Sequence, residues 1–152
     1  MKINQLELSE FRNYETLSVT FDEAVNILYG DNAQGKTNVL EAIYLCGTTK
    51  SHKGSKDKEM IRLSSEESHI RMQIEKAGIP HRIDMHLRKN KAKGVAIDGV
   101  PIKRSSELMG LLHIVFFLSG GSFHDKERSG RTAQIYRFGA LSVGYVLFVS
   151  FG

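Results

Sequence analysis

The sequence has few of the features that mark secreted or membrane-bound proteins. It contains one cysteine, Cys46, among 152 residues, which excludes an internal disulfide framework and is typical of the reducing cytosol. Its N-terminus lacks the apolar core of a signal peptide. Its longest apolar stretch, residues 141–151, is shorter than the roughly 20 residues that a membrane-spanning helix needs. We therefore expect a cytoplasmic protein that does not contact a membrane.

The sequence also has only a small excess of positive over negative charge. The net charge is +4, the isoelectric point is near 9.2, and 41% of the residues are hydrophobic against 25% charged. This balance is that of an ordinary globular protein, neither disordered nor fibrous. The slight basic excess permits a polyanionic partner, but it is spread over many residues and does not by itself predict one.

The pattern of apolar residues predicts a chain of the α/β class. Residues 24–30 read as a buried strand that runs into a glycine-rich loop, and residues 36–46 carry apolar side chains at helical spacing. Alternating apolar residues predict further strands. These occupy residues 3–8, 17–21, 70–74, 83–87 and 95–97.

Polar segments connect these elements. Residues 47–58 are basic and have no apolar period, which predicts a surface loop. Tight turns are expected near Gly78 and at Asp98–Gly99. Beyond them, the sequence indicates a short capped helix over residues 105–110 and a buried strand over residues 111–117.

One motif in this pattern carries chemistry. Gly30, Gly35, Lys36 and Thr37 form G-x-x-x-x-G-K-T between the predicted buried strand and the predicted helix. The glycines let backbone N–H groups and the helix N-terminus approach phosphate oxygens. Lys36 would reach the outer phosphates of a nucleotide, and the Thr37 hydroxyl would ligate Mg²⁺. The motif therefore predicts a nucleotide site.

A second feature that hydrolysis requires is missing. An acidic residue at the end of another buried strand should help to hold Mg²⁺. The segments around Asp84 and Asp98 alternate between polar and apolar residues, so they read as half-exposed strands. We therefore expect no ATP hydrolysis at a useful rate. A small phosphotransferase would use the same loop, and this alternative stays open although no acceptor site or lid is evident.

Three stretches around this motif resemble one family. They read MKINQLELSEFRNYE, GDNAQGKTNVLEAIYL and TTKSHKGSKDKEMIR, at residues 1–15, 30–45 and 48–62. In order and spacing, residues 1–117 resemble the N-terminal lobe of the RecF family of bacterial recombinational DNA repair ATPases. The resemblance implies an α/β P-loop NTPase fold of the ABC and SMC head type. This lobe would carry additional antiparallel strands, and the head would be truncated.

The resemblance also implies a function. RecF proteins bind ATP and DNA, form an ATP-dependent homodimer, and act with RecO and RecR to place RecA at single-strand gaps in DNA replication, recombination and the SOS response. Arg12 and Asn13 match positions that approach the nucleotide, although both could simply be turn residues. The nucleotide-binding positions implied by the family are Gly30, Asp31, Asn32, Ala33, Gln34, Gly35, Lys36, Thr37, Asn38, Arg12 and Asn13.

Two lysine-rich segments are candidates for contact with single-stranded or gapped DNA. Such residues bind the phosphate backbone with release of counterions, but they also form ordinary solvated surfaces. The histidines His52, His81 and His86 lack the sequence spacing of a metal site. The candidate DNA contacts are Lys50, Lys53, Lys56, Lys58, Arg88, Lys89, Lys91 and Lys93.

The composition changes after residue 117. Residues 118–152 hold six of the 14 glycines and follow neither period until a final apolar run. We back-translated residues 118–142 with permitted codons that were chosen to test the reading frame. Read one nucleotide later, this DNA encodes SPEDLSMIKNGPAERRRFIDLELC, which resembles the RecF continuation. We expect that an extra nucleotide shifted the frame, so that residues 118–152 form a poorly structured tail outside the family. An inert truncation product is therefore a second hypothesis.

Overall fold

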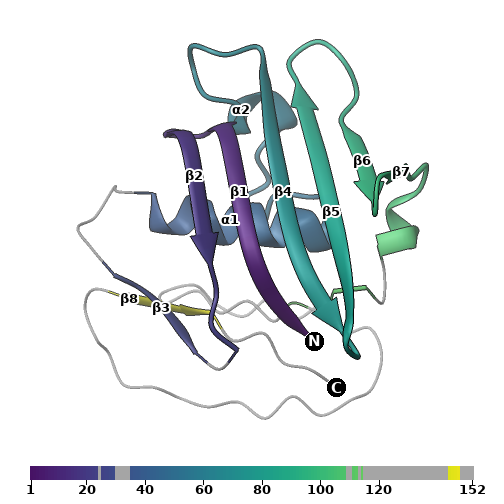
Figure 1. Cartoon of the computed structure of the whole chain (residues 1–152). Helices are drawn as coiled ribbons and strands as arrows, with labels where there is room; N and C mark the ends of the chain where they lie inside the picture. The colour runs from purple at the N-terminus through teal and green to yellow at the C-terminus, as the bar shows by residue number, and fades with distance from the viewer. Residues whose placement is uncertain (24, 30–34, 109–110, 113, 115–143, 148–152) are drawn as a thin grey trace.

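A computed structural model describes residues 1–23, 25–29, 35–108, 111–112, 114 and 144–147. Within these residues, the structure contains strands, two α-helices and a short 3₁₀ helix, η1 (Figure 1). Their bounds are β1 Lys2–Phe11, β2 Tyr14–Thr20, β3 Asn26–Tyr29, α1 Lys36–Thr48, α2 Asp57–Met60, β4 Glu67–Lys76, β5 Ile79–Arg88, β6 Gly94–Ile97, β7 Val100–Pro101, η1 Ser105–Leu108 and β8 Gly144–Leu147.

Antiparallel strands build the main sheet in the order β2-β1-β4-β5-β6-β7 (Figure 1). Its hairpins close through tight turns that contain residues of positive φ. These residues include Arg12 (54°) between β1 and β2, Gly78 (80°) between β4 and β5, and Gly99 (83°) between β6 and β7. Such turns match the right-handed twist of the flanking strands. The strands and turns predicted from alternating residues are confirmed.

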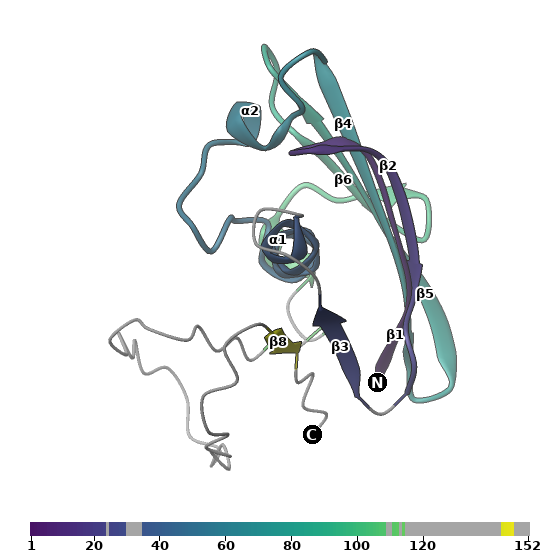
Figure 2. The same ribbon diagram turned by 90° about the vertical axis from the view of Figure 1, so that its left-hand side faces the viewer.

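Helix α1 packs on one face of this sheet, as Figure 2 shows with α1 seen end-on. Residues of β4 and β5 alternate between buried and more exposed positions, so every second side chain enters the core between sheet and helix. Cys46 lies on α1 and is fully buried, and burial raises the pKa of its thiol. The largest buried side chains are Phe11, Leu6, Ile43, Leu45, Met60, Ile70, Met72, Ile74, Ile83, Met85, Leu87 and Leu108.

Strand β3 lies outside the main sheet. It pairs antiparallel with β8, with Asn26 opposite Leu147. Its side chains Ile27 and Tyr29 are 61% and 85% exposed. The strand predicted within residues 24–30 is thus confirmed, but its predicted burial is wrong. The reason is that β8 pairs with β3 only through the backbone at one edge of the strand. Among the described residues, none covers the face of β3 that carries Ile27 and Tyr29.

The predicted surface loop over residues 47–58 is shorter at both ends than expected. Helix α1 continues to Thr48, and α2 begins at Asp57. A hydrogen bond from the Lys56 backbone N–H to the Glu59 carboxylate, of 3.0 Å, closes the first turn of α2. Local capping therefore makes a helical turn where the polar composition alone predicted loop.

The expected elements after residue 104 are only partly described. The short capped helix is the 3₁₀ turn η1, and Glu107 accepts a hydrogen bond from the Arg104 backbone N–H (2.9 Å). Leu112 is buried, but most of the expected strand over residues 111–117 lies outside the described residues. In the tail, only Gly144–Leu147 is described, as β8.

Candidate nucleotide-binding site

The predicted phosphate loop connects β3 to α1. β3 ends at Tyr29 and α1 begins at Lys36, which confirms the predicted strand before the motif and the predicted helix after it. Gly35 caps the helix in the left-handed conformation, with φ 94° and ψ 3°, which favours glycine over residues with a Cβ atom. The other loop positions lie outside the described residues: Gly30, Asp31, Asn32, Ala33 and Gln34.

The turn between β1 and β2 packs directly against Gly35. A Cβ atom at Gly35 would lie 2.5 Å from the Tyr14 hydroxyl oxygen and 2.8 Å from Asn13 Nδ2, closer than non-bonded atoms approach. Asn13 Oδ1 also accepts a hydrogen bond from Asn38 Nδ2 of 2.8 Å. Residue 35 therefore lies between the β1–β2 turn and the first turn of α1, and a larger residue there would be strained by its positive φ and would displace Tyr14 or Asn13.

The N-terminus of α1 suits a phosphate group. The first backbone N–H groups of a helix have no intrahelical acceptor, and the helix dipole is positive at that end. α1 has no acidic residue in its first turn, and Lys36, Thr37 and Asn38 are partly exposed there. A lysine, a hydroxyl and backbone donors are the groups that hold a triphosphate and its Mg²⁺. The described residues thus fit both.

Arg12 forms an ion pair with a buried carboxylate on α1. Its Nε donates to Glu41 Oε2 (3.0 Å) and its Nη2 donates to Glu41 Oε1 (2.8 Å), and Glu41 is fully buried. Arg12 also donates to the Glu59 carbonyl oxygen (2.8 Å) and to the Ser55 hydroxyl (2.7 Å). This guanidinium therefore ties the β1–β2 turn to α1 and to the segment before α2.

Glu41 was not predicted as part of the site. Burial pushes the pKa of its carboxyl up, but hydrogen bonds from Arg12 and Ser51 and the charges of Arg12 and Lys53 outweigh burial and lower the pKa. The Ser51 hydroxyl donates at 2.6 Å and Lys53 Nζ lies at 3.4 Å. A sequence signal did exist, because Glu41 is the one acidic residue in the largely apolar stretch 39–46.

The two lysine-rich segments meet at one end of the molecule. Lys93, between β5 and β6, donates a hydrogen bond of 2.6 Å to the carbonyl oxygen of Thr49 and forms an ion pair of 2.9 Å with Asp57. Figure 1 shows α2 and the β5–β6 connection at the same end of the sheet. The basic residues of both segments therefore belong to one region of the surface.

Half of these candidate DNA contacts have local partners. Lys53 pairs with Glu41, Lys89 pairs with Glu66 at 3.0 Å, and Arg88 donates to the Ala92 carbonyl oxygen at 2.8 Å. A cation engaged in this way is less available to phosphate. Within the described part of the chain, the candidates that enter no ion pair are Lys50, Lys56, Lys58, Lys91 and Arg88.

The two acidic residues considered for Mg²⁺ are engaged on the main sheet. Asp84 accepts hydrogen bonds from Arg71 (2.8 Å) and Arg82 (2.7 Å). Asp98 lies in the turn before β7 and contacts His81 Nδ1 at 2.8 Å. Neither is therefore placed to hold an ion beside Thr37.

Comparisons with known proteins decide the family. The family model described as the AAA ATPase domain matches residues 1–119. The chain belongs to this family. Within it, the chain is an N-terminal segment of RecF type. The DNA replication and repair protein RecF of Lachnoclostridium phytofermentans is 68% identical over 117 residues, and that of Clostridium novyi is 43% identical over the same length. Each match covers 77% of this chain and 32% of the relative, so the chain spans about a third of these RecF proteins.

Solved structures confirm the fold class of this RecF-type segment. The recombination mediator protein RecF with ATP, from the RecFOR pathway, superposes with a TM-score of 0.73 at 30% identity, covering 78% of this chain and 33% of that chain. The SMC head domain from Thermotoga maritima superposes with a TM-score of 0.61 at 18% identity, covering 74% and 43%. This second likeness concerns the fold alone. Among the described helices, none is long and apolar enough to cross a membrane.

Proposed function

We propose that this RecF-type segment binds ATP in cytoplasmic recombinational DNA repair and replication. The observation that carries the proposal is the packing at Gly35, whose left-handed backbone is enclosed by Tyr14 and Asn13 at the N-terminus of α1. The 68% identity to a RecF protein supports the same function. The N-terminus of α1 has no acidic residue in its first turn, and a helix N-terminus of this kind favours a phosphate group.

In the proposed complex, backbone N–H groups of the phosphate loop and of the N-terminus of α1 would bind the phosphates, and Lys36 would contact the outer ones. The Thr37 hydroxyl would ligate Mg²⁺, and a bound Mg²⁺ would supply positive charge next to the phosphates. Asn13 and Asn38 hold the end of the loop through their mutual hydrogen bond. Arg12 acts as a positioning residue, because its guanidinium is already bound to Glu41.

The proposed macromolecular partners follow from the RecF relatives. Single-stranded or gapped DNA would contact the basic end of the sheet, where Lys50, Lys56, Lys58 and Lys91 are exposed. We also propose that the protein acts with RecO and RecR in the loading of RecA. This part of the proposal rests on a solved RecF relative that belongs to the RecFOR pathway. The ATP-dependent homodimer that the resemblance implies is not part of the proposal for this chain.

We expect this chain to hold ATP without hydrolysing it. Phosphoryl transfer needs an acidic residue at the metal and a group that positions water, and Asp84 and Asp98 are engaged elsewhere. Phosphate release from Mg-ATP should therefore be the same for the natural chain and for Lys36→Ala. A rate that is present in the natural chain and lost in Lys36→Ala would refute binding without turnover.

We also propose that residues 118–152 arose from a shifted reading frame. Support comes from the comparisons, since the RecF relatives match over 117 residues and the family model matches up to residue 119. Sequencing the gene across codons 117 and 118 tests this. We expect a RecF-like frame one nucleotide away from the present one, and the absence of such a frame downstream would exclude the shift.

A further inference from the structure

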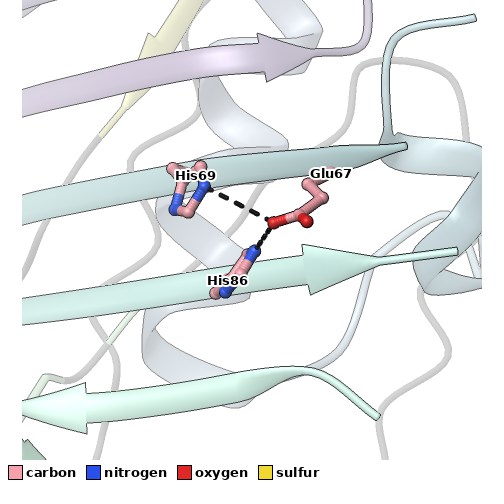
Figure 3. Close-up of side chains that lie close together, drawn as sticks. All are labelled: Glu67, His69 and His86. Carbon is pink, nitrogen blue, oxygen red and sulfur yellow. Dashed lines mark hydrogen bonds and ion pairs between the residues drawn. The ribbon is translucent and has the colours of Figure 1, made fainter. Parts of the chain in front are cut away.

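Two histidines and a glutamate come together on the main sheet, away from the nucleotide site. Figure 3 shows Glu67 and His69 on β4 and His86 on the neighbouring β5. Each offers one ligand atom, and these atoms all lie within 4.8 Å of one another. Sequence spacing alone gave no metal site for His86, but strand pairing supplies the missing ligands.

The register of the β4–β5 hairpin produces this cluster. The turn at Ala77 and Gly78 places Lys76 opposite Ile79, and farther along the same ladder His69 stands directly opposite His86. Directly opposed residues of antiparallel strands have Cβ atoms about 4.5–5.5 Å apart. Glu67 lies two residues before His69 and therefore on the same face of β4.

This cluster is open to solvent on the face of the sheet that α1 does not cover. The side chains of Glu67, His69 and His86 are 53%, 61% and 33% exposed, whereas Ser68 and Ile70 between and beside them are buried. An ion can therefore reach the three ligands without opening the core. A hollow of about 450 Å³, lined in part by His69 and His86, adjoins the cluster on this face.

The present contacts are close to those of a metal complex. Glu67 Oε2 contacts His86 Nε2 and lies 4.0 Å from His69 Nε2, and the two imidazole rings stack with centroids 4.1 Å apart. Ligands about 2.0–2.1 Å from a tetrahedral ion are about 3.3 Å apart. Because the three side chains are partly exposed, rotations about their bonds can bring the ligand atoms closer to that geometry. A bound ion would replace the direct contact between Glu67 and His86.

We propose that Glu67, His69 and His86 bind a late first-row divalent cation, of which Zn²⁺ is the representative. Two imidazoles and one carboxylate select such ions over Mg²⁺ and Ca²⁺, which prefer oxygen ligands. Three protein ligands leave a fourth position of the ion for water, and the hollow beside the histidines gives that water room. The ion would join β4 to β5 and does not depend on ATP.

The test is calorimetric titration of the full chain, without a polyhistidine tag, with zinc chloride alone. We expect one Zn²⁺ per chain, and a loss of affinity of more than about tenfold in His69→Ala and in His86→Ala, since even an outer-shell partner contributes about that much. Cys46 is fully buried and does not compete as a ligand.

Two further variants separate this site from incidental binding. His81→Ala is the matched control, because His81 lies on β5 like His86 but contacts Asp98, and it should bind Zn²⁺ like the natural chain. Glu67→Gln can still hydrogen-bond His86 but is a weak ligand, so its affinity should fall. Equal affinity in all these chains, or no Zn²⁺ uptake by the natural chain, would overturn the proposal. Lys36→Ala should leave Zn²⁺ binding unchanged.

Discussion

Replacing Arg12 with alanine is expected to lower the free energy of unfolding by about 3 kcal/mol. Removing one partner of a buried ion pair costs about 3–5 kcal/mol, because the other charge stays buried without compensation. Glu41 is fully buried and receives two hydrogen bonds from Arg12. We expect the lower end of this range because Ser51 and Lys53 still contact Glu41. Denaturant unfolding at pH 7 measures the change.

The matched control is Arg71→Ala on the outer face of the sheet. Arg71 is 50% exposed and pairs with Asp84 at 2.8 Å, and exposed pairs contribute about 0–1 kcal/mol. A second control, the double variant Arg12→Met with Glu41→Leu, removes both charges and should recover most of the lost stability. If Arg12→Ala destabilises no more than Arg71→Ala, the ion pair does not hold this part of the fold.

The same prediction has a pH dependence. Since the pKa of Glu41 is lowered in the folded state, its stabilising contribution is present above the unfolded value of 4.5 and is lost as the pH falls through the folded pKa. In Arg12→Ala the main partner of that carboxylate is gone. The difference in stability between the two chains should therefore narrow below pH 4.5. A difference that stays constant into that acid range would mean that Arg12 stabilises by packing.

The hairpins could be predicted from sequence because their signals are local. Alternating apolar residues define each strand, and Gly78 and the pair Asp98–Gly99 provide positive φ where the chain reverses. The short helix α2 was missed because its signal is a cap, the Glu59 carboxylate at the Lys56 N–H, and not an apolar period. Because the residues of this segment are mostly polar, composition alone predicts a loop there.

Contacts between distant parts of the chain could not be predicted in this way. Arg12 and Glu41 meet because the β1–β2 turn folds over α1, and no spacing in the sequence encodes that contact. The burial of β3 was predicted wrongly for a related reason, since a strand pattern indicates an apolar face and not what covers it. Ile27 and Tyr29 are exposed although their sequence context is that of a buried strand.

Gly35 is the position of the predicted phosphate loop that the structure describes. The motif predicted a glycine at residue 35 for close backbone approach, and the structure gives the reason in φ 94° and in the contacts of Tyr14 and Asn13. The hydrogen bonds of Arg12 to Glu41 support the positioning role proposed for this residue, and its approach to the nucleotide stays a prediction. Both roles require that the loop binds ATP.

The most direct test of the account is therefore thermal unfolding of the full chain with and without Mg-ATP, in the natural chain and in Lys36→Ala. A ligand that binds only the folded state at 100 times its Kd adds about 2.7 kcal/mol of stability. Lys103→Ala serves as the control, since Lys103 is an exposed lysine far along the chain from the loop. We predict that Mg-ATP raises the Tm of the natural chain and of Lys103→Ala but not that of Lys36→Ala. An unchanged Tm in all three would contradict the account and identify an inert segment.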